Sequence, residues 1–461
     1  MSSGTRRWFG TDGVRGRAGE GPLATPFLVR LGRALGEQVA ADGGGEVLLA
    51  RDTRASGPAI VSALADGLAS AGARVIDLGV LPTPGLALAM RTRRSARGAV
   101  VSASHNPWQD NGVKLFGPGG HKLSDAQEHA LEDRVVELGG EGEGALPAEL
   151  EEAADVPLPA REDGARGYVD EMLERFAGLD LSGRRLVVDC AHGAASETGP
   201  TVLERLGASV EAICTAPDGR NINARCGSTH LETLADAVRR AGAELGLAFD
   251  GDADRVLCVD AGGRECHGDH MLGLLGTWMA DAERLPQRTV VATVMSNLGL
   301  ERMLGERSIQ LLRTAVGDRY VNAAMREGGY GLGGEASGHL LFGAEHENTG
   351  DGLYTALKVL TALGETGRSV ADAIDAVPVI PQVLLNVPVA DRPPLDQLPA
   401  LQERVAAAEG RHGSDIRIVL RYSGTERLAR VMVEGVDAGV VQGLADELAA
   451  LWVEEIGIHT S

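Results

Sequence analysis

The stretch Leu245-Gly-Leu-Ala-Phe-Asp-Gly-Asp-Ala-Asp-Arg255 joins an apolar segment directly to three alternating carboxylates. The apolar part is typical of a buried strand, and the acidic loop follows at its carboxyl end. Two other segments repeat this arrangement: Gly98–Val101 runs into Ser102–Pro107, and Tyr330–Gly333 runs into Gly334–His339. Open α/β sheets place their chemistry at the carboxyl ends of strands, so these three loops are the candidate functional segments.

Upstream of each loop lies a unit made of a strand, a helix, a glycine and a second strand. In the first unit these are Val47–Ala50, Ala59–Ala71, Gly72 and Val75–Ile76. A threefold repeat of this pattern predicts three related α/β domains with mixed sheets flanked by helices. The other two units comprise, in the same order, Leu186–Asp189, Thr201–Leu206, Gly207 and Val210–Cys214, then Val290–Thr293, Leu298–Leu304, Gly305 and Ile309–Leu312.

The pattern changes after residue 372 and predicts a smaller α+β domain. Its expected elements are the strand Val383–Val389, the helix Leu401–Glu409, a hairpin of Ile416–Arg421 with Arg430–Glu434, and the helix Val440–Trp452. A linker rich in Gly, Glu and Ala covers Gly139–Pro159, and within it Leu146–Asp155 is predicted as a charged helix. The expected domains are 1–155, 156–258, 259–372 and 373–461.

The composition excludes several classes of function. Among 461 residues, 44 Lys and Arg stand against 65 Asp and Glu, a net charge of -21, which disfavours binding to nucleic acid or to an anionic membrane. The five cysteines form no Cys-x-x-Cys pair, so we expect reduced thiols. The N-terminus has no apolar signal region and the longest apolar stretch, Met271–Met279, contains Gly, so we expect a soluble, cytoplasmic protein.

The alternating carboxylates Asp250, Asp252 and Asp254 would repel one another unless a cation lies among them. Their spacing suits one hard divalent ion held by oxygens, and Mg²⁺ is the natural choice where no histidine takes part. An EF-hand is excluded, because its sixth and twelfth positions would be Arg255 and Ala261 instead of Gly and Glu. The alternative is a solvated acidic turn.

Ser104 lies directly after a predicted buried strand, in Ser-Ala-Ser-His-Asn-Pro. A serine there can be a nucleophile, a phosphate carrier or a helix N-cap. No Gly-x-Ser-x-Gly motif supports a hydrolase triad. The adjacent His105, the nearby Lys114 and a metal loop elsewhere favour a serine that carries a phosphoryl group.

Three further segments offer groups for an anionic ligand. Arg421-Tyr-Ser-Gly-Thr-Glu426 suits a phosphate cradle, with an ordinary hairpin turn as the alternative. Phe9–Gly16 is glycine-rich and carries Arg15, but it lacks the Gly-Lys-Ser/Thr ending of a P-loop. Gly334–His339 supplies a carboxylate, a hydroxyl and an imidazole, which suit the hydroxyls of a sugar.

Taken together, these motifs resemble the α-D-phosphohexomutase superfamily and, within it, the bacterial phosphoglucosamine mutase family. The resemblance runs nearly end to end and keeps the order of the motifs. It rests on Phe9–Gly16, Arg51–Gly57, Ser102–Lys122, Gly227–His230, Met295–Leu298, Thr314–Arg319 and Thr349–Gly352.

The resemblance implies a heart-shaped enzyme with four domains around a central cleft, to which each domain contributes one loop. It also implies interconversion of glucosamine 6-phosphate and glucosamine 1-phosphate through a phosphoserine and a sugar 1,6-bisphosphate, feeding UDP-N-acetylglucosamine and cell-wall synthesis. By the same resemblance, one Mg²⁺ per subunit is held by the three aspartates and by the phosphate on Ser104. The resemblance further implies general acid–base chemistry for Lys114 and His339, and it makes Arg15 and Arg255 active-site cations. It implies that Glu335 and Ser337 contact the sugar, and that the phosphate that does not react is bound by Arg421, Ser423, Gly424, Thr425 and Arg430. His105 is a further catalytic candidate because it lies beside Ser104.

The chain departs from the family pattern at Ala336, Tyr422, Arg427 and His192. Ala336 bears on sugar preference, so a phosphomannomutase/phosphoglucomutase is the alternative function. An inactive sugar-phosphate-binding protein and a phosphatase are further alternatives. The expected partner is a small phosphosugar, with no nucleic acid and no membrane, and the expected state is a monomer or homodimer.

Overall fold

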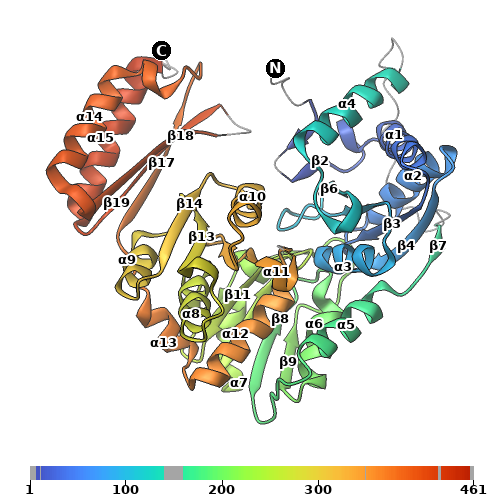
Figure 1. Ribbon diagram of the computed structural model, residues 1–461, viewed down its shortest axis with the longest axis horizontal. Coiled ribbons are helices and arrows are strands. Elements are labelled where there is room, and N and C mark those ends of the chain that lie inside the picture. The colour runs from blue at the N-terminus through green and yellow to red at the C-terminus, as the bar shows by residue number, and fades with distance from the viewer. Residues whose placement is uncertain (1–6, 11, 140–158, 348, 424–426, 457–461) are drawn as a thin grey trace.

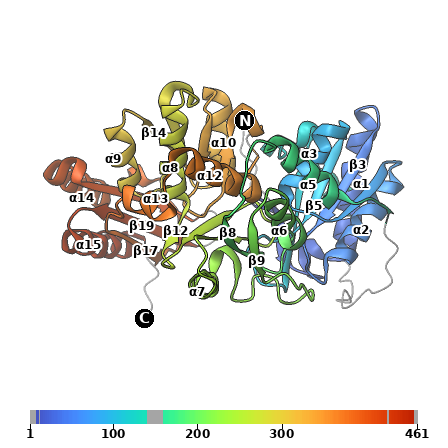
Figure 2. The same cartoon turned by 90° about the horizontal axis from the view of Figure 1, so that it is seen from below.

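The computed structural model describes residues 7–10, 12–139, 159–347, 349–423 and 427–456. Within them the strands form four sheets, one for each colour zone from blue to red in Figure 1. The first domain is mainly blue, the second mainly green, the third mainly yellow to orange, and the C-terminal domain orange to red. The first and last domains occupy opposite ends of the molecule in both Figure 1 and Figure 2.

The first sheet has helices on both faces because its strands alternate apolar side chains between two cores. Val47 and Leu49 of β3 lie in one buried cluster, whereas Leu48 and Ala50 lie in another. The strand order is β1-β2-β6-β5-β3-β4-β7. Its elements are β1 (Phe9–Gly10), β2 (Gly13–Arg17), α1 (Thr25–Ala41), β3 (Glu46–Arg51), α2 (Gly57–Ser70), β4 (Arg74–Val80), α3 (Thr83–Arg93), β5 (Arg97–Val101), β6 (Asp110–Phe116), α4 (Asp125–Gly139) and β7 (Ala160–Arg161).

The second and third sheets repeat the centre of the first. The orders β4-β3-β5-β6, β9-β8-β10-β11 and β14-β13-β15-β16 share three parallel strands followed by one antiparallel strand. The predicted threefold repeat and the predicted fold class are therefore confirmed. The second domain contains α5 (Gly164–Arg175), β8 (Arg185–Asp189), α6 (Ala195–Arg205), β9 (Ser209–Ile213), α7 (Glu232–Ala241), β10 (Leu245–Phe249), β11 (Val256–Asp260) and β12 (Glu265–Cys266).

Each candidate loop joins the last parallel strand of its sheet to the antiparallel strand. The loops after β5, β10 and β15 are the three that the sequence singled out. The third domain contains α8 (Gly268–Asp281), β13 (Thr289–Thr293), α9 (Leu298–Glu306), β14 (Gln310–Thr314), α10 (Asp318–Gly328), β15 (Leu332–Gly334), β16 (Leu340–Phe342), α11 (Gly343–His346), α12 (Gly352–Thr366) and α13 (Val370–Ala376).

The C-terminal sheet, of order β17-β19-β18, packs against α14 and α15 around the buried Trp452. It meets the third domain through Arg417, which donates to the carbonyls of Val294 at 2.8 Å and Ser296 at 3.0 Å. Its elements are β17 (Gln382–Pro388), α14 (Pro399–His412), β18 (Ile416–Tyr422), β19 (Leu428–Gly435) and α15 (Ala438–Ile456).

Two expected domain boundaries fall inside elements. The boundary at 258/259 lies within β11, and the one at 372/373 lies within α13. Because β11 and β12 both belong to the second sheet, we propose boundaries between β12 and α8 and between α13 and β17. The linker helix expected at Leu146–Asp155 lies outside the described residues. Among the described residues, no helix is long and apolar enough to cross a membrane.

Candidate active site where three domains meet

Ser104 is buried and adopts a left-handed backbone conformation, with φ 52°. Its Oγ donates to Oδ2 of Asp250 at 2.6 Å and lies 3.3 Å from Nδ1 of His105. The residues between β5 and β6 are all described and contain no helix, so the helix N-cap alternative is wrong. The left-handed turn, unusual for a residue other than glycine, directs the hydroxyl toward the acidic loop of the second domain.

Arg54 holds the backbone of this serine loop. Its side chain is fully buried, and all five of its N–H groups have partners. Nε donates to Asp52 at 2.9 Å, and the terminal nitrogens donate to the carbonyls of Ser104 at 3.0 Å, Asn106 at 2.8 Å, Asp110 at 2.9 Å and Pro107. Arg54 therefore fixes the loop without facing a ligand, and the sequence had given it no role.

The second domain contacts the same loop from the other side. Nδ2 of Asn223 donates to the carbonyls of Ser104 at 2.9 Å and Asn106 at 3.0 Å. Gly251 packs so closely that a Cβ there would lie 2.4 Å from the Ser104 carbonyl oxygen. The serine loop and the acidic loop are thus fitted to one another through backbone contacts.

The three aspartates of the acidic loop are buried, and one oxygen of each lies within 4.8 Å of the others. Burial and the neighbouring Asp254 and Asp252 raise the pKa of Asp250 well above its usual range. In the part of the chain that the structure describes, Oδ1 of Asp252 and Oδ1 of Asp254 have no hydrogen-bond partner. Buried carboxylate oxygens without partners are costly unless a cation binds them, so this donor set fits Mg²⁺.

Lys114, on β6, points into the acidic loop and is also buried. Its Nζ lies 2.7 Å from Oδ2 of Asp252, 3.1 Å from Oδ2 of Asp254 and 3.0 Å from Oδ2 of Asp12. Burial alone would lower the pKa of Lys114, but the three carboxylates raise it well above its usual value. The side chain is therefore a cation in this arrangement. Thr83 also donates to Oδ2 of Asp252 at 2.5 Å.

The third domain contributes His339, whose Nδ1 lies 3.5 Å from Oδ1 of Asp254 and whose Nε2 lies 3.7 Å from Oδ2 of Asp318. Burial lowers the pKa of His339, but Asp254 more than offsets this, so its pKa is raised. Burial in turn raises the pKa of Asp254, yet Lys114 and His339 hold it well below its usual range. On the same loop, Oε1 of Glu335 accepts from the amide of Gly317 at 3.1 Å, and Ser337 is half-buried.

Arg15 and Arg255 place positive charge beside the serine loop. Arg15 donates to Oδ2 of Asp12 at 2.6 Å, and Nε of Arg255 lies 3.7 Å from Oδ1 of Asp254. Burial first, and then these two arginines, lower the pKa of His105 to about 4. His105 is therefore a neutral imidazole near pH 7, beside the Ser104 hydroxyl.

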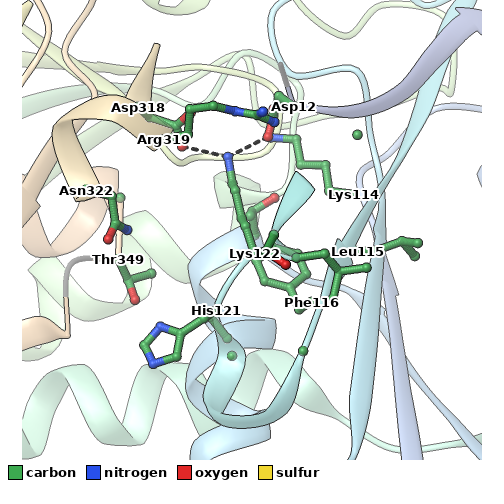
Figure 3. A pocket seen from close by; sticks show the side chains of 18 of the residues that line it. Asp12, Lys114, Leu115, Phe116, His121, Lys122, Asp318, Arg319, Asn322 and Thr349 are labelled. Atoms are coloured by element: carbon green, nitrogen blue, oxygen red, sulfur yellow. Dashed lines mark hydrogen bonds and ion pairs between the residues drawn. The ribbon is translucent and has the colours of Figure 1, made fainter. Parts of the chain in front are cut away.

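A cavity of about 580 Å³ opens from this cluster between the first and third domains (Figure 3). Lys114, Asp254 and His339 line its inner part, and the volume suits a ligand of the size of a sugar phosphate. Figure 3 shows Lys122 bridging the two domains, since its Nζ donates to Asp12 at 2.5 Å and to Asp318 at 2.6 Å. The sequence had not singled out Asp12, Lys122 or Asp318.

The phosphate cradle expected in the C-terminal domain is only partly described. Arg421 on β18 lies directly opposite Arg430 on β19, and the amide of Ser423 donates to the carbonyl of Leu428 at 2.8 Å. Gly424 and Thr425 lie outside the described residues. Figure 1 shows this domain across the molecule from the first domain, with the ends of β18 and β19 that carry these residues turned toward it. Arg427, one of the departures, is exposed.

Most of the chain matches models of one enzyme family. Phosphoglucomutase/phosphomannomutase alpha/beta/alpha domains I, II and III match residues 6–139, 166–263 and 267–379, and the C-terminal domain of that family matches 384–451. A phosphoglucosamine mutase of Cereibacter sphaeroides is 45% identical over 450 residues, which is 97% of this chain and 98% of the relative. One from Anaeromyxobacter dehalogenans is 44% identical over 98% of this chain and 100% of its own.

Solved structures agree with the fold. A phosphoglucomutase/phosphomannomutase family protein from Burkholderia thailandensis superposes with a TM-score of 0.78 at 26% identity, covering 96% of this chain and 97% of its own. An N-acetylphosphoglucosamine mutase from Aspergillus fumigatus, solved with GlcNAc-6P and magnesium, has a TM-score of 0.64 at 20% identity and covers 97% of this chain and 96% of its own. With its relatives, the chain is an isomerase that moves a phosphoryl group on a hexosamine phosphate. The chain belongs to the phosphoglucosamine mutases of the α-D-phosphohexomutase superfamily.

Proposed function

We propose that this enzyme interconverts glucosamine 6-phosphate and glucosamine 1-phosphate with Ser104 as the carrier of the phosphoryl group. The observation that supports this most is the place of the Ser104 hydroxyl. It is buried, held on a left-handed turn, and 2.6 Å from the Asp250 carboxylate of the acidic loop. Such a hydroxyl is suited to hold a phosphate between a cation and proton-transferring groups.

We propose that Asp250, Asp252 and Asp254 hold Mg²⁺, together with an oxygen of the phosphorylated Ser104. When bound, the ion supplies positive charge that offsets the charge on the transferring phosphoryl group. Oδ1 of Asp252, which is buried and has no hydrogen-bond partner among the described residues, supports this assignment. Magnesium in the Aspergillus structure belongs to a protein that shares the fold, and it makes the same ion the first to test here.

In the proposed reaction, phosphorylated Ser104 donates its phosphoryl group to the free hydroxyl of the bound sugar phosphate. The bond from phosphorus to Oγ breaks, a bond to the sugar oxygen forms, and the proton lost by the sugar is matched by one gained at Oγ. We propose that Lys114 and His339 handle these protons. The raised pKa of His339 favours a protonated imidazole that can donate to a departing oxygen, whereas Lys114, whose pKa is well above its usual value, would give up its proton only after a bound ligand changes its acidic surroundings. The sugar 1,6-bisphosphate then turns, and Ser104 accepts the other phosphate.

We propose that Glu335 and Ser337 bind the sugar hydroxyls and that Arg421, Ser423 and Arg430, with Gly424 and Thr425, bind the phosphate that does not react. Two arginines face each other across β18 and β19, and burial and Arg430 lower the pKa of Arg421. Like charges opposed on one sheet face repel, so an anion between them would stabilise the pair. The substrate would then be enclosed by movement of the C-terminal domain toward the first.

The decisive experiment compares kcat/KM for glucosamine 6-phosphate, glucose 6-phosphate and mannose 6-phosphate, with Mg²⁺ and a trace of sugar bisphosphate. A preference for the amino sugar is expected. Ala336, whose carbonyl accepts from the amide of Gly268 at 2.9 Å, lies in the sugar loop and departs from the family pattern. Equal or faster turnover of the neutral sugars would favour a phosphomannomutase/phosphoglucomutase instead. Ala336→Gln tests whether this position sets the preference. A cytoplasmic monomer or homodimer remains our proposal for the working state.

A further inference from the structure

A second group of metal-binding side chains lies in the second domain, outside the acidic loop. One ligand atom each from His192, Cys214 and Cys226 lies within 4.8 Å of the others. Cys226 is buried, whereas His192 and Cys214 are half-buried, so the group is reachable from solvent on one side. None of these three side chains has a role in the proposed phosphoryl transfer.

The backbone brings these residues together in a strained arrangement. His192 follows the end of β8, Cys214 follows the end of the adjacent parallel strand β9, and the amide of His192 donates to the carbonyl of Cys214 at 2.6 Å. Ala191, His192 and Cys214 have φ values of 53°, 50° and 53°. Left-handed backbone at residues other than glycine is unfavourable, and it is retained most often where a side chain must be aimed at a functional partner.

The side chains around the group favour a cation. The Asp189 carboxyl group is buried beside it, and its two oxygens accept from the amides of Ala191 and Gly227, each at 2.9 Å. Nδ1 of His192 is buried and has no hydrogen-bond partner among the described residues. A metal ion that binds a cysteine thiol readily displaces its proton.

We propose that His192, Cys214 and Cys226 form a thiolate–imidazole site for a transition-metal ion of the zinc class, with its remaining position open to solvent. Zinc bonds to sulfur are about 2.3 Å and to nitrogen about 2.1 Å, so tetrahedral ligands lie about 3.5–3.8 Å apart. The ligand atoms, all within 4.8 Å of one another, therefore need to close by at most about 1.3 Å. Binding one divalent ion releases two thiol protons to solvent and needs no oxidant.

Two ligands of the proposed metal site, Cys214 and Cys226, lie at the two ends of a segment that supports the phosphoserine loop. Residues 214–226 include Asn223, whose side chain donates to the carbonyls of Ser104 and Asn106. The same segment meets the first domain where the amide of Ala55 donates to the carbonyl of Gly219 at 2.9 Å. The proposed ligand His192 meets the first domain separately, since Thr53 donates to its carbonyl at 2.6 Å. A metal ion joining Cys214 to Cys226 would hold both ends of this segment and reduce its local opening.

The test uses the full-length enzyme, reduced, stripped with a chelator and then loaded with Zn²⁺ in the presence of excess Mg²⁺. After desalting, we expect about one zinc ion per chain. Replacing Zn²⁺ by Co²⁺ is expected to produce the near-ultraviolet absorption of a thiolate bound to cobalt. The acidic loop offers only oxygen ligands, so it cannot produce that band. Hydrogen exchange of residues 214–226 should slow when Zn²⁺ is added.

Cys214→Ser and His192→Asn are each expected to weaken Zn²⁺ binding by at least about tenfold. Cys266→Ser is the matched control, because this thiol faces Cys258 across β11 and β12 and belongs to no such group of three ligands in the described chain. Absence of the thiolate band, or equal zinc retention in Cys214→Ser, would overturn the proposal. So would loss of two free thiols without metal, which would indicate a Cys214–Cys226 disulfide. His192→Asn keeps both thiols and decides the matter if Cys214→Ser does not fold.

Discussion

Replacing Arg54 by lysine tests whether the phosphoserine loop is held by hydrogen bonds and not by charge alone. Arg54 uses five N–H donors, one on Asp52 and four on carbonyls of residues 104–110. A lysine ammonium has three donors. Arg54→Lys therefore keeps the charge that compensates Asp52 but loses at least two of the five hydrogen bonds.

Each lost hydrogen bond costs about 0.5–1.5 kcal/mol net, so the loss of two in Arg54→Lys should lower the free energy of unfolding by about 1–3 kcal/mol. Arg54→Met should cost more, because it also leaves the buried Asp52 carboxylate without its cation. A displacement of the Ser104 hydroxyl by about 1 Å should reduce kcat/KM about a hundredfold. Both effects come from the same lost contacts.

The measurements are urea unfolding followed by tryptophan fluorescence, with Trp108 inside the loop as the reporter, and kcat/KM for glucosamine 6-phosphate. Arg33→Lys is the control, since its half-exposed ion pair with Glu37 should contribute less than about 1 kcal/mol. A stability within about 0.5 kcal/mol of the wild type, with unchanged kcat/KM, would refute the reasoning, because it would mean that the five contacts carry no net free energy.

Ser104→Ala should abolish turnover and the mass increase of one phosphate after incubation with a sugar bisphosphate, while circular dichroism stays unchanged; turnover near the wild-type rate would remove Ser104 from its proposed role. Adding Mg²⁺ at about a hundred times its Kd should stabilise the wild type by about 2.7 kcal/mol. Asp252→Asn should lose most of that increase in Tm and be no less stable than the wild type without Mg²⁺, because it removes one of the crowded carboxylates; an equal Mg²⁺ effect in both would contradict the assignment. Gly251→Ala should cost about 1–3 kcal/mol and lower kcat, since its Cβ would meet the Ser104 carbonyl at 2.4 Å. Gly167→Ala is its control, having no described atom within 4 Å of the added Cβ, and equal Tm values in the two variants would argue against a tight fit between the loops.

The sequence predicted those parts of the fold that repeat a strong local pattern. The strand expected at Leu245–Phe249 has the same bounds in the structure, and the strand expected at Val290–Thr293 begins one residue earlier. The patterns found in the sequence include no strand at Asp110–Phe116, a segment whose Asn-Gly pair is typical of a turn. Pairing with β5 on one side and β2 on the other outweighs that local preference.

The residues of the site also divide into those that the sequence could predict and those that it could not. Carboxylates, a serine and a histidine at the ends of predicted strands could be found from the sequence, because their residue types in those loops already indicate chemistry. Arg54 and Asn223 could not, since both act by donating hydrogen bonds to backbone carbonyls, and no residue type marks a carbonyl that needs a donor. Asp12, Lys122 and Asp318 form a chain of charges between distant segments, which only the tertiary structure brings together.

The charges of the site explain how an enzyme with a net charge of -21 can hold an anionic substrate. Without a cation, Lys114 lies among Asp12, Asp252 and Asp254, and burial with its acidic neighbours raises the pKa of Asp250. A phosphate on Ser104 would add about two negative charges beside Asp250, which that arrangement cannot accept without a divalent ion. In the proposed mechanism the metal and the phosphoserine therefore stabilise one another, since each offsets a charge that the other makes costly. The same dependence would keep the phosphoryl group on the enzyme until a sugar hydroxyl reaches it.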